Sequence, residues 1–303
     1  MPKKTALVMR ATGRQGTGAI RHLVEVGWQV HAFVTDATSD RALALRCFGP
    51  QVALFQGIWN DPSTLKEAIH GCRALFFNQL PSTDDAELQE ARVVLKLAEE
   101  AGVQHVVFTS SLPLSNSNIQ EILQTSAAAL SILGKADVER LVKASGMTWT
   151  ILRPGYFLTN LLPPLIYYIH PEIKQNKMIN SYGPACRLAV VDPDDTGALA
   201  TAAFEDPVKF GSQTIAAVSE IVRFDDLVEE FGKAIGTPIE AIYRTPKETE
   251  EIKHERVVAG QLICVGLDKF VDMEEVRSWG VPLTSTRSFF KKHKHELQDI
   301  TGP

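Results

Sequence analysis

The chain has 303 residues, of which 45% are hydrophobic and 22% are charged, and its formal net charge at pH 7 is −5. These proportions are typical of a globular protein, and the length suffices for one large domain or for a domain with a smaller lobe. The net negative charge argues against direct binding of nucleic acid through a broad basic face.

Cysteines, histidines and apolar runs indicate the compartment. The four cysteines are far apart and form no C-x-x-C pair, which is typical of free thiols in a reducing compartment. The eight histidines include no H-x-x-x-H pair and none spaced with a cysteine, so no metal site is expected. The apolar run before Arg10 is too short for a signal peptide, and the longest one, residues 161–169, is too short to span a bilayer. We therefore expect a cytoplasmic protein without membrane association.

The chain opens with an apolar strand pattern that breaks into the turn Arg-Ala-Thr-Gly-Arg-Gln-Gly, residues 10–16, followed by an amphipathic segment over residues 19–26. Strand, glycine turn and helix in this order are typical of a dinucleotide-binding βαβ unit. Glycines let the N–H groups of the helix N-terminus approach a pyrophosphate. Gly13 and Gly16 meet this need, but Arg10 stands where such a loop usually has its first glycine. An ordinary βα turn is the alternative.

A second strand pattern, residues 29–34, ends in Thr35 and Asp36. An acidic residue here, about 20 residues beyond the glycines, usually holds the ribose 2′-hydroxyl of NAD, whereas an arginine favours the 2′-phosphate of NADP. Arg14 and Arg41 lie on either side of Asp36 in the sequence, so both cofactors stay open. A role of Asp36 as a turn or capping residue is the alternative.

Strand and helix patterns alternate through the first half of the chain. Further strands are predicted at residues 52–56, 74–78, 105–111 and 149–154, with helices at 61–70 and 84–101 and another ending near 144. Near-continuous apolar strands separated by helices predict an α/β fold whose parallel sheet is covered on both faces. Because strand ends in such sheets line the ligand crevice, we expect Asn78, Ser110 and the corner at residues 153–156 to converge near the glycine turn.

Several segments together resemble the NmrA-like family of atypical short-chain dehydrogenase/reductases. They are residues 57–62, 109–111, 133–139, 150–160, 188–197, 210–215, 224–228 and 279–293, and they cover essentially the whole chain. The resemblance implies a Rossmann-type doubly wound parallel sheet over residues 1–155. It also implies a small C-terminal α+β substrate lobe over residues 156–303, with some segments returning to the Rossmann sheet.

The same resemblance implies which residues hold NAD(P). The matching positions are Thr12, Gly13, Gln15 and Gly16 for the diphosphate, Thr35 and Asp36 for the adenosine ribose, Asn78, Thr109 and Ser110 for the nicotinamide side, and Pro154, Tyr156 and Phe157, with Asn160 nearby, against the nicotinamide. Lys135 matches the lysine that binds the nicotinamide ribose and, in the reductases, assists proton transfer. A surface ion pair with Glu139 is the alternative role of Lys135.

Arg10, Thr35 and Ile58 depart from the family pattern, and all three positions belong to cofactor binding. Arg10 replaces a glycine, Thr35 a common basic residue, and Ile58 an acidic residue that helps to hold adenine. We expect Arg10 to bind phosphate oxygens, since the remaining loop glycines keep room for a phosphate. The alternative is that Arg10 occupies the phosphate cradle itself and excludes the dinucleotide. Arg14 or Arg41 is expected to give a weak preference for NADP(H), with NAD(H) and loss of the cofactor as alternatives.

The proton donor is the least defined part of the predicted site. Ser131 stands where an ordinary short-chain dehydrogenase has its tyrosine acid, and a serine hydroxyl is too weak an acid to replace a phenol. Tyr156 or a water positioned by the substrate is the candidate replacement. We therefore assign the catalytic roles to Lys135, Tyr156 and Ser110.

Three function classes remain. The first is an NAD(P)H-dependent reductase of a small, largely apolar carbonyl, imine or conjugated alkene; the retained Lys135 favours it, and the aromatic residues after the sixth strand suit such a substrate. The second is a non-catalytic, redox-sensing regulator that binds NAD(P) and a protein partner, which fits the missing tyrosine. The third is a cofactor-independent isomerase, dehydratase or cyclase, which fits the altered cofactor positions. The oligomeric state is left open.

Overall fold

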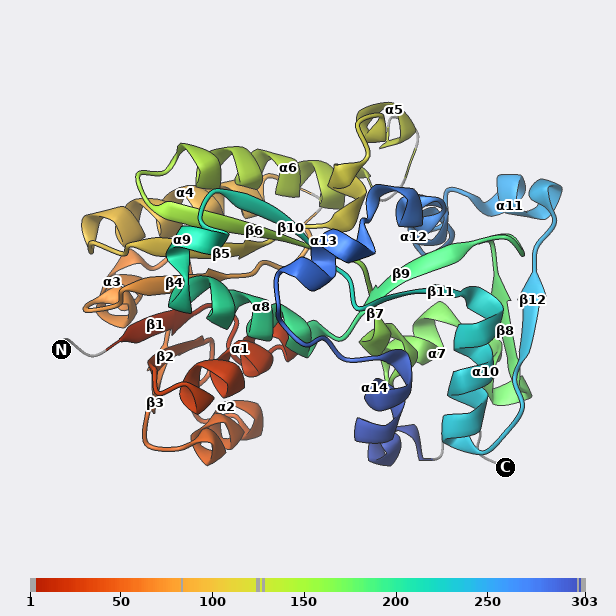
Figure 1. Cartoon of the computed structure of the whole chain (residues 1–303), viewed down its shortest axis with the longest axis horizontal. Helices are drawn as coiled ribbons and strands as arrows, with labels where there is room; N and C mark the ends of the chain where they lie inside the picture. The colour runs from red at the N-terminus through yellow and green to blue at the C-terminus, as the bar shows by residue number, and fades with distance from the viewer. Residues whose placement is uncertain (1–3, 83, 124–125, 127–128, 299, 301–303) are drawn as a thin grey trace. The chain divides into compact units, whose positions relative to one another are not determined.

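The computed structural model describes residues 4–82, 84–123, 126, 129–298 and 300. The chain forms two compact units (Figure 1). The first comprises residues 1–111, 130–153 and 193–215, and the second comprises residues 112–129, 154–192 and 216–303. Each unit is therefore assembled from three separate stretches of the chain.

A seven-stranded sheet with the order β10-β6-β5-β4-β1-β2-β3 is the framework of the first unit. Its strands are β1 (Thr5–Val8), β2 (Gln29–Val34), β3 (Val52–Gln56), β4 (Ala74–Phe77), β5 (His105–Thr109), β6 (Thr148–Pro154) and β10 (Gln213–Ala217). Strands β1 to β6 pair in parallel throughout. This is the strand order of a Rossmann fold, whose two halves meet between β1 and β4.

Helices cover both faces of this sheet (Figure 1). On one face α3 (Pro62–Ile69), α4 (Ala86–Glu100) and α6 (Ala129–Ala144) bury apolar side chains against the strands. On the other face α1 (Arg14–Glu25) packs on α8 (Pro193–Glu205). Their contact is so close that a Cβ atom at Gly18 would lie 2.8 Å from the Cα atom of Asp194. The short helices α2 (Asp40–Ala44), η1 (Leu45–Phe48) and α9 (Pro207–Phe210) complete the unit. The predicted doubly wound α/β fold is confirmed.

Local sequence signals explain where two of these helices begin and end. The side chain of Asp61 caps α3 by accepting a hydrogen bond from the N–H of Ser63 (3.0 Å), and Pro62 occupies the first turn, where a missing N–H costs nothing. Helix α4 stops just before Gly102, whose φ of +79° is a conformation that glycine adopts most easily. These signals fix the start of α3 and the end of α4, and α4 carries residues of the candidate site.

The second unit mixes short strands with short helices. A three-stranded sheet has the order β11-β9-β7, and a two-stranded sheet pairs β12 with β8. The strands are β7 (Tyr156–Phe157), β8 (Lys177–Asn180), β9 (Arg187–Val191), β11 (Glu220–Arg223) and β12 (Glu240–Tyr243). The helices are η2 (Leu112–Ser115), α5 (Ile119–Leu123), η3 (Leu158–Leu161), α7 (Leu165–Ile169), η4 (Pro171–Gln175), α10 (Phe224–Ile235), α11 (Pro246–Ile252), α12 (Arg256–Cys264), η5 (Leu267–Phe270), α13 (Met273–Ser278), α14 (Thr286–Lys292) and η6 (Lys294–Leu297). Its core gathers around buried aromatic side chains from α10 and α14.

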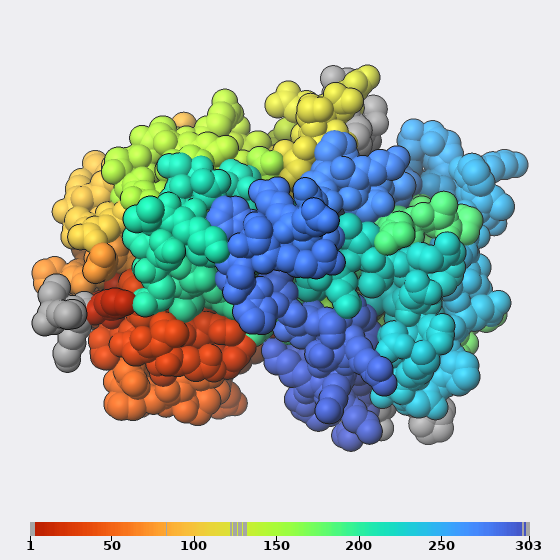
Figure 2. Space-filling model, viewed as in Figure 1, coloured from red at the N-terminus to blue at the C-terminus, as the bar shows by residue number. Residues whose placement is uncertain are grey.

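The basic residues 291–295 lie on the surface of the second unit, at the end of α14 (dark blue in Figure 2). Lys291, Lys294 and His295 are exposed, whereas His293 is buried and its Nδ1 atom lies 2.6 Å from Glu296 Oε1. Within the described part of the chain, no helix has both the length and the apolar character needed to cross a bilayer.

Candidate functional site

The turn between β1 and α1 keeps the shape of a glycine turn although Arg10 occupies its first position. Arg10 has a φ of +48°, in the left-handed region that glycine adopts most easily. The N–H of Gly13 donates to the Arg10 carbonyl oxygen (2.9 Å), and the N–H of Ala11 donates to that of Phe33 (3.2 Å). A Cβ atom at Gly16 would lie 2.5 Å from the Arg10 carbonyl oxygen, so a glycine is needed for α1 to approach β1 this closely. The predicted strand, turn and helix are therefore all present.

Helix α1 begins without a side-chain cap. Its N-cap residue, Gly13, is extended and offers no side-chain acceptor, and the first turn contains no acidic residue. A Cβ atom at Gly13 would meet the Arg10 carbonyl oxygen at 3.3 Å and is otherwise unobstructed within the described residues. First-turn N–H groups lack intrahelical acceptors and lie at the positive end of the helix dipole. This helix end therefore suits a phosphate group.

Asn78 and Gln79 follow β4, the strand that neighbours β1 at the meeting point of the two sheet halves. Both residues are more than nine-tenths buried, and Asn78 Oδ1 and Gln79 Oε1 have no hydrogen-bond partner among the described residues. An unpaired buried acceptor is unfavourable by about 1–3 kcal/mol, so these oxygens indicate donors that a ligand would supply. The hydroxyl and amide groups of a dinucleotide fit this requirement.

Glu90 of α4 binds Arg10 and Gln79. Arg10 Nη2 donates to Glu90 Oε2 at 3.0 Å, and Gln79 Nε2 donates to the same oxygen at 3.1 Å. Gln79 Nε2 also donates to the Glu87 carbonyl oxygen at 2.8 Å. The Glu90 side chain is only 4% exposed, whereas that of Arg10 is 30% exposed. The buried Arg10 Nε atom has no hydrogen-bond partner among the residues that the structure describes. Arg10 therefore uses one of its donors on α4 and keeps another inside the molecule.

Lys135 of α6 is buried and forms its ion pair with Glu87. Lys135 Nζ donates to Glu87 Oε1 at 2.8 Å, and the two side chains are 9% and 2% exposed. The N–H of Ser82 donates to the other Glu87 oxygen at 3.1 Å, and a Cβ atom at Gly134 would lie 3.0 Å from that oxygen. The alternative role of Lys135, a surface pair with Glu139, is therefore wrong, because Lys135 is buried against α4.

Glu139 binds Arg153 and Ser110 instead. Arg153 Nε donates to Glu139 Oε1 at 2.9 Å, and its Nη2 donates to Oε2 at 2.8 Å. Ser110 Oγ donates to Glu139 Oε1 at 2.6 Å. Because Ser110 follows β5 and Arg153 belongs to β6, Glu139 ties the ends of two neighbouring strands to α6. Ser110 and Arg153 thus converge as predicted, but the Ser110 hydroxyl proton is held by Glu139.

Thr35 and Asp36, which follow β2, are exposed, and Asp36 bonds to its near neighbours in the chain. Asp36 Oδ1 accepts hydrogen bonds from the Thr38 N–H (2.8 Å) and Oγ1 (2.6 Å), and these bonds hold the pKa of Asp36 below its ordinary value. The turn role proposed as the alternative for Asp36 is therefore present. Thr35, Arg14 and Arg41 are exposed as well. Their contacts with a ribose or a 2′-phosphate stay a prediction.

Pro154, Tyr156, Phe157 and Asn160 belong to the second unit. Burial raises the pKa of the Tyr156 phenol well above its usual range, and Cys264 adds to this rise, whereas Asn160 and Tyr182 oppose it. This phenol is protonated at neutral pH and can donate a hydrogen bond. The side chain of Ser131, at the position of the usual tyrosine, lies outside the described residues.

The other predicted residues occupy the same edge of the sheet in the first unit. Thr12 lies in the turn after β1, Gln15 in the first turn of α1, and Thr109 at the end of β5, where it is 2% exposed. Gln15 Oε1 accepts a hydrogen bond from Thr196 Oγ1 at 3.3 Å. The glycine turn and three strand ends therefore meet at one edge, as parallel strands require.

Sequence reasoning missed the acidic residues that organise this edge. Glu87 and Glu90 lie on the same face of α4 as the buried Ala91 and Val94. Two carboxylates within an apolar helical stripe were the signal that could have identified them, because buried carboxylates need paired cations.

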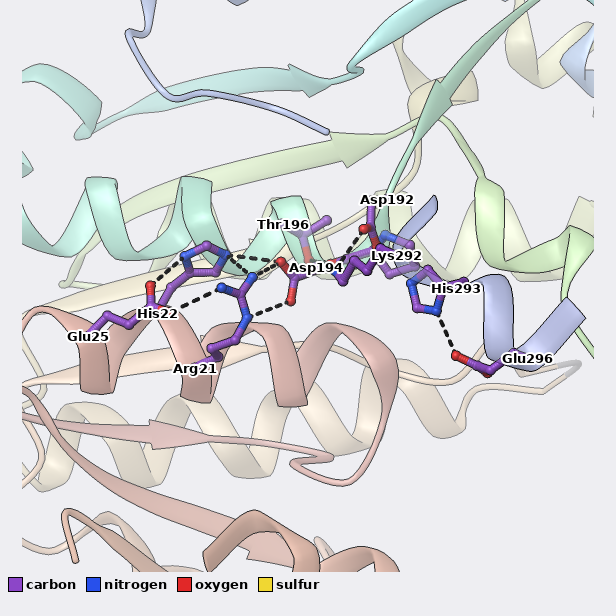
Figure 3. A network of polar contacts seen from close by, with 10 residues as sticks. Arg21, His22, Glu25, Asp192, Asp194, Thr196, Lys292, His293 and Glu296 are labelled. Atoms are coloured by element: carbon purple, nitrogen blue, oxygen red, sulfur yellow. Dashed lines mark hydrogen bonds and ion pairs between the residues drawn. The ribbon is translucent and has the colours of Figure 1, made fainter. Parts of the chain in front are cut away.

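A further network that sequence reasoning missed fixes α1 to the beginning of α8 (Figure 3). Arg21 donates to both carboxylate oxygens of Asp194, and His22 Nε2 lies 3.1 Å from Asp194 Oδ2. In the second unit, Lys292 Nζ donates to Asp192 Oδ2 at 3.1 Å. The residues flanking Pro193 are thus each held by an ion pair within their own unit.

The fold and the glycine turn define a Rossmann-type α/β protein with a second unit, whose sheets have fewer strands. A model of the NmrA-like family matches residues 2–271. This chain therefore belongs to the NmrA-like family, which confirms the resemblance found in the sequence.

Similar proteins include named reductases and a regulator. A (4-alkanoyl-5-oxo-2,5-dihydrofuran-3-yl)methyl phosphate reductase from Streptomyces griseus is 27% identical over 220 residues, which cover 71% of this chain and 72% of the relative. An NAD(P)H azoreductase from Xenophilus azovorans is 24% identical over 245 residues, covering 81% of this chain and 79% of the relative. The structure of NmrA, a negative transcriptional regulator, in complex with NADP has a TM-score of 0.76 at 20% identity, covering 100% of this chain and 99% of that one. This structural likeness supports the fold.

Proposed function

We propose that this chain is an NAD(P)H-dependent reductase of a small, largely apolar molecule with a carbonyl, imine or conjugated alkene. The observation that carries the proposal is the pair of buried oxygens on Asn78 and Gln79, which have no hydrogen-bond partner in the described part of the chain. They lie at the same sheet edge as the uncapped N-terminus of α1. The named activities of the relatives from Streptomyces griseus and Xenophilus azovorans support redox chemistry.

Different residues of this chain would bind different parts of the dinucleotide. In the proposal, Arg10, Thr12, Gly13, Arg14, Gln15 and Gly16 hold the diphosphate, Thr35 and Asp36 the adenosine ribose, and Asn78, Thr109 and Lys135 the nicotinamide side. A contact of Pro154, Tyr156, Phe157 and Asn160 with the nicotinamide stays a prediction from the family resemblance. The exposed cations Arg14 and Arg41 would favour NADP(H) weakly over NAD(H).

The bound cofactor would supply a hydride, and the protein would supply orientation and a proton. Lys135 is held by Glu87 at 2.8 Å, so its ammonium is a fixed donor for a ribose hydroxyl and for the oxygen or nitrogen of the acceptor. The proposed proton donor is the Tyr156 phenol or a water positioned by the substrate; burial raises the pKa of this phenol, which makes it a weaker acid than an exposed tyrosine. The hydroxyl of Ser110 donates its hydrogen bond to Glu139, so its oxygen would serve as a hydrogen-bond acceptor in the site.

The test is a titration of the purified protein with NADPH and with NADH, followed by nicotinamide fluorescence. Consumption of NADPH is then measured with a quinone, an azo dye and a conjugated ketone as acceptors. We expect saturable binding and turnover of at least one acceptor, and Lys135→Met should lower that turnover by orders of magnitude. Absence of binding at millimolar dinucleotide would contradict the proposal and favour a cofactor-independent isomerase, dehydratase or cyclase.

A redox-sensing regulator is the second candidate. It is favoured by one observation, namely that Lys135 and Ser110, two of the three groups assigned to catalysis, are each held by a buried carboxylate. The likeness to NmrA in complex with NADP fits this candidate as well. Tight binding of NADPH without turnover of any acceptor, together with a protein partner that responds to the oxidised or reduced form, would support it.

A further inference from the structure

Glu90 contributes a negative charge to the part of the site where a diphosphate would carry its own. Its side chain is 4% exposed, and its partners come from the ends of the two strands between which the sheet halves meet. They are Arg10, after β1, and Gln79, after β4. A buried carboxylate is tolerated when a cation and further donors satisfy it. Arg10 therefore already has a partner in the absence of any ligand.

The geometry of Arg10 leaves donors for a second partner. A guanidinium has five N–H donors in one rigid plane, and Glu90 takes one from Nη2. The Nε atom is buried and has no partner within the described residues. The Arg10 backbone is in the left-handed region at φ +48°, so the side chain leaves the turn in a direction that the usual conformation would not give. Fixing Nη2 thus fixes the plane of the whole guanidinium, in a side chain that is 30% exposed.

We propose that Glu90 is a positioning residue that orients Arg10 toward a phosphate oxygen of the dinucleotide. Glu90 accepts from Nη2, and the remaining donors of the same guanidinium plane bind the ligand. This inference rests on the proposed function, because it requires a dinucleotide in the site. The inference assigns a role in dinucleotide binding to Glu90, a residue outside the glycine turn. Glu90 would determine whether Arg10, at the position of the first glycine, can bind a phosphate.

The neighbouring ion pair on α4 has the same form. One helical turn before Glu90, Glu87 holds Lys135 Nζ at 2.8 Å. The amide of Gln79 joins the two pairs, since it donates to Glu90 Oε2 and to the Glu87 carbonyl oxygen. Helix α4 therefore orients two cations in the proposed site. Glu87 orients Lys135 on the nicotinamide side, and Glu90 orients Arg10 on the diphosphate side.

The test is a double-mutant cycle on the affinity for NADPH, measured by fluorescence titration of the whole chain. We expect Arg10→Gly and Glu90→Ala each to weaken binding about tenfold, and the double variant to bind within about threefold of either single variant. Glu90→Gln keeps an oxygen that accepts from Nη2 and should stay within about threefold of the wild type. Glu100→Gln, an exposed substitution on the same helix, is the matched control and should leave the affinity unchanged.

Two further measurements separate positioning from a merely structural role. Arg10→Lys keeps the charge but has one nitrogen, which cannot hold Glu90 and also reach a phosphate, so it should lose about as much affinity as Arg10→Gly. This variant leaves Glu90 intact and serves if Glu90→Ala does not fold. The loss of affinity in Arg10→Gly should also shrink at high salt, because it removes a charged contact.

The outcomes distinguish this inference from the proposed function. Tighter binding in Glu90→Ala, additive losses in the double variant, or full affinity in Arg10→Lys would overturn the role of Glu90 while leaving dinucleotide binding in place. A wild-type protein that binds neither NADPH nor NADH would overturn both proposals.

Discussion

The two ends of the proposed dinucleotide site hold their charges in different ways. On the nicotinamide side, Glu87 and Lys135 are buried and paired with each other. On the adenosine side, Asp36 and Arg41 are exposed, and Asp36 bonds to its near neighbours Thr38 and Ser39. Removing one partner of a buried pair leaves an uncompensated charge, whereas exposed pairs contribute little. Substitutions should therefore affect folding at the first end and only ligand choice at the second.

The largest effect is expected for Lys135→Met. It leaves the Glu87 carboxylate buried without a counter-charge, so the free energy of unfolding should fall by about 3–5 kcal/mol, measured by urea denaturation. Removing an exposed lysine would leave the melting temperature nearly unchanged. The double variant Glu87→Gln/Lys135→Met removes both charges and should regain most of the loss. Wild-type stability in Lys135→Met would refute the contrast drawn between the two ends.

A second comparison sets the buried carboxylate of Glu139 against Lys143, an exposed cation near it. Glu139→Ala removes the paired bonds from Arg153 and the bond from Ser110, and should lower the free energy of unfolding by about 2–4 kcal/mol. Lys143 is 3.9 Å from the same carboxylate and 42% exposed, so Lys143→Ala should lower it by less than about 0.5 kcal/mol. Equal losses of unfolding free energy in Glu139→Ala and Lys143→Ala would show that burial does not determine the size of the effect.

The pH dependence of stability tests a buried group that has no counter-charge. Burial lowers the pKa of His105 to about 4, below the ordinary value of 6.5. Between these values the unfolded chain binds the proton more readily, so this histidine should cost up to about 3 kcal/mol of stability as the pH falls from 6.5 to 4. His105→Gln should reduce the slope of this part of the profile without removing it, because burial lowers the pKa of His170 to about 4 as well. The exposed His295→Gln should leave the slope unchanged. A profile that keeps its slope in His105→Gln would show that His105 does not titrate in this way.

The smallest effect is expected at the adenosine side. Arg14→Ala and Arg41→Ala should leave the melting temperature unchanged, because both residues are exposed. At least one of them should reduce the ratio of NADPH to NADH affinity, by about fivefold or less. The ratio is measured by parallel fluorescence titrations. If neither variant changes it, the assignment of a 2′-phosphate contact to these arginines is wrong.

The sequence predicted the first unit well because its signals are local. The strand pattern, the glycine turn and the apolar stripe of residues 84–101 each span one element, and α4 was found at Ala86–Glu100. The ion pairs were not predictable in this way, since Glu87 and Lys135 are 48 residues apart and Arg10 and Glu90 are 80 apart. In the second unit, β7 has only two residues, too few to show a period.

The central claim is that the dinucleotide binds where α1 begins and β4 ends, and hydrogen exchange locates that site directly. We predict that saturating NADPH slows exchange in peptides covering residues 10–18 and 78–90. Peptides covering the exposed basic cluster at residues 291–295 should be unaffected. Unchanged exchange at residues 10–18 and 78–90 in a protein that does bind NADPH would contradict the account.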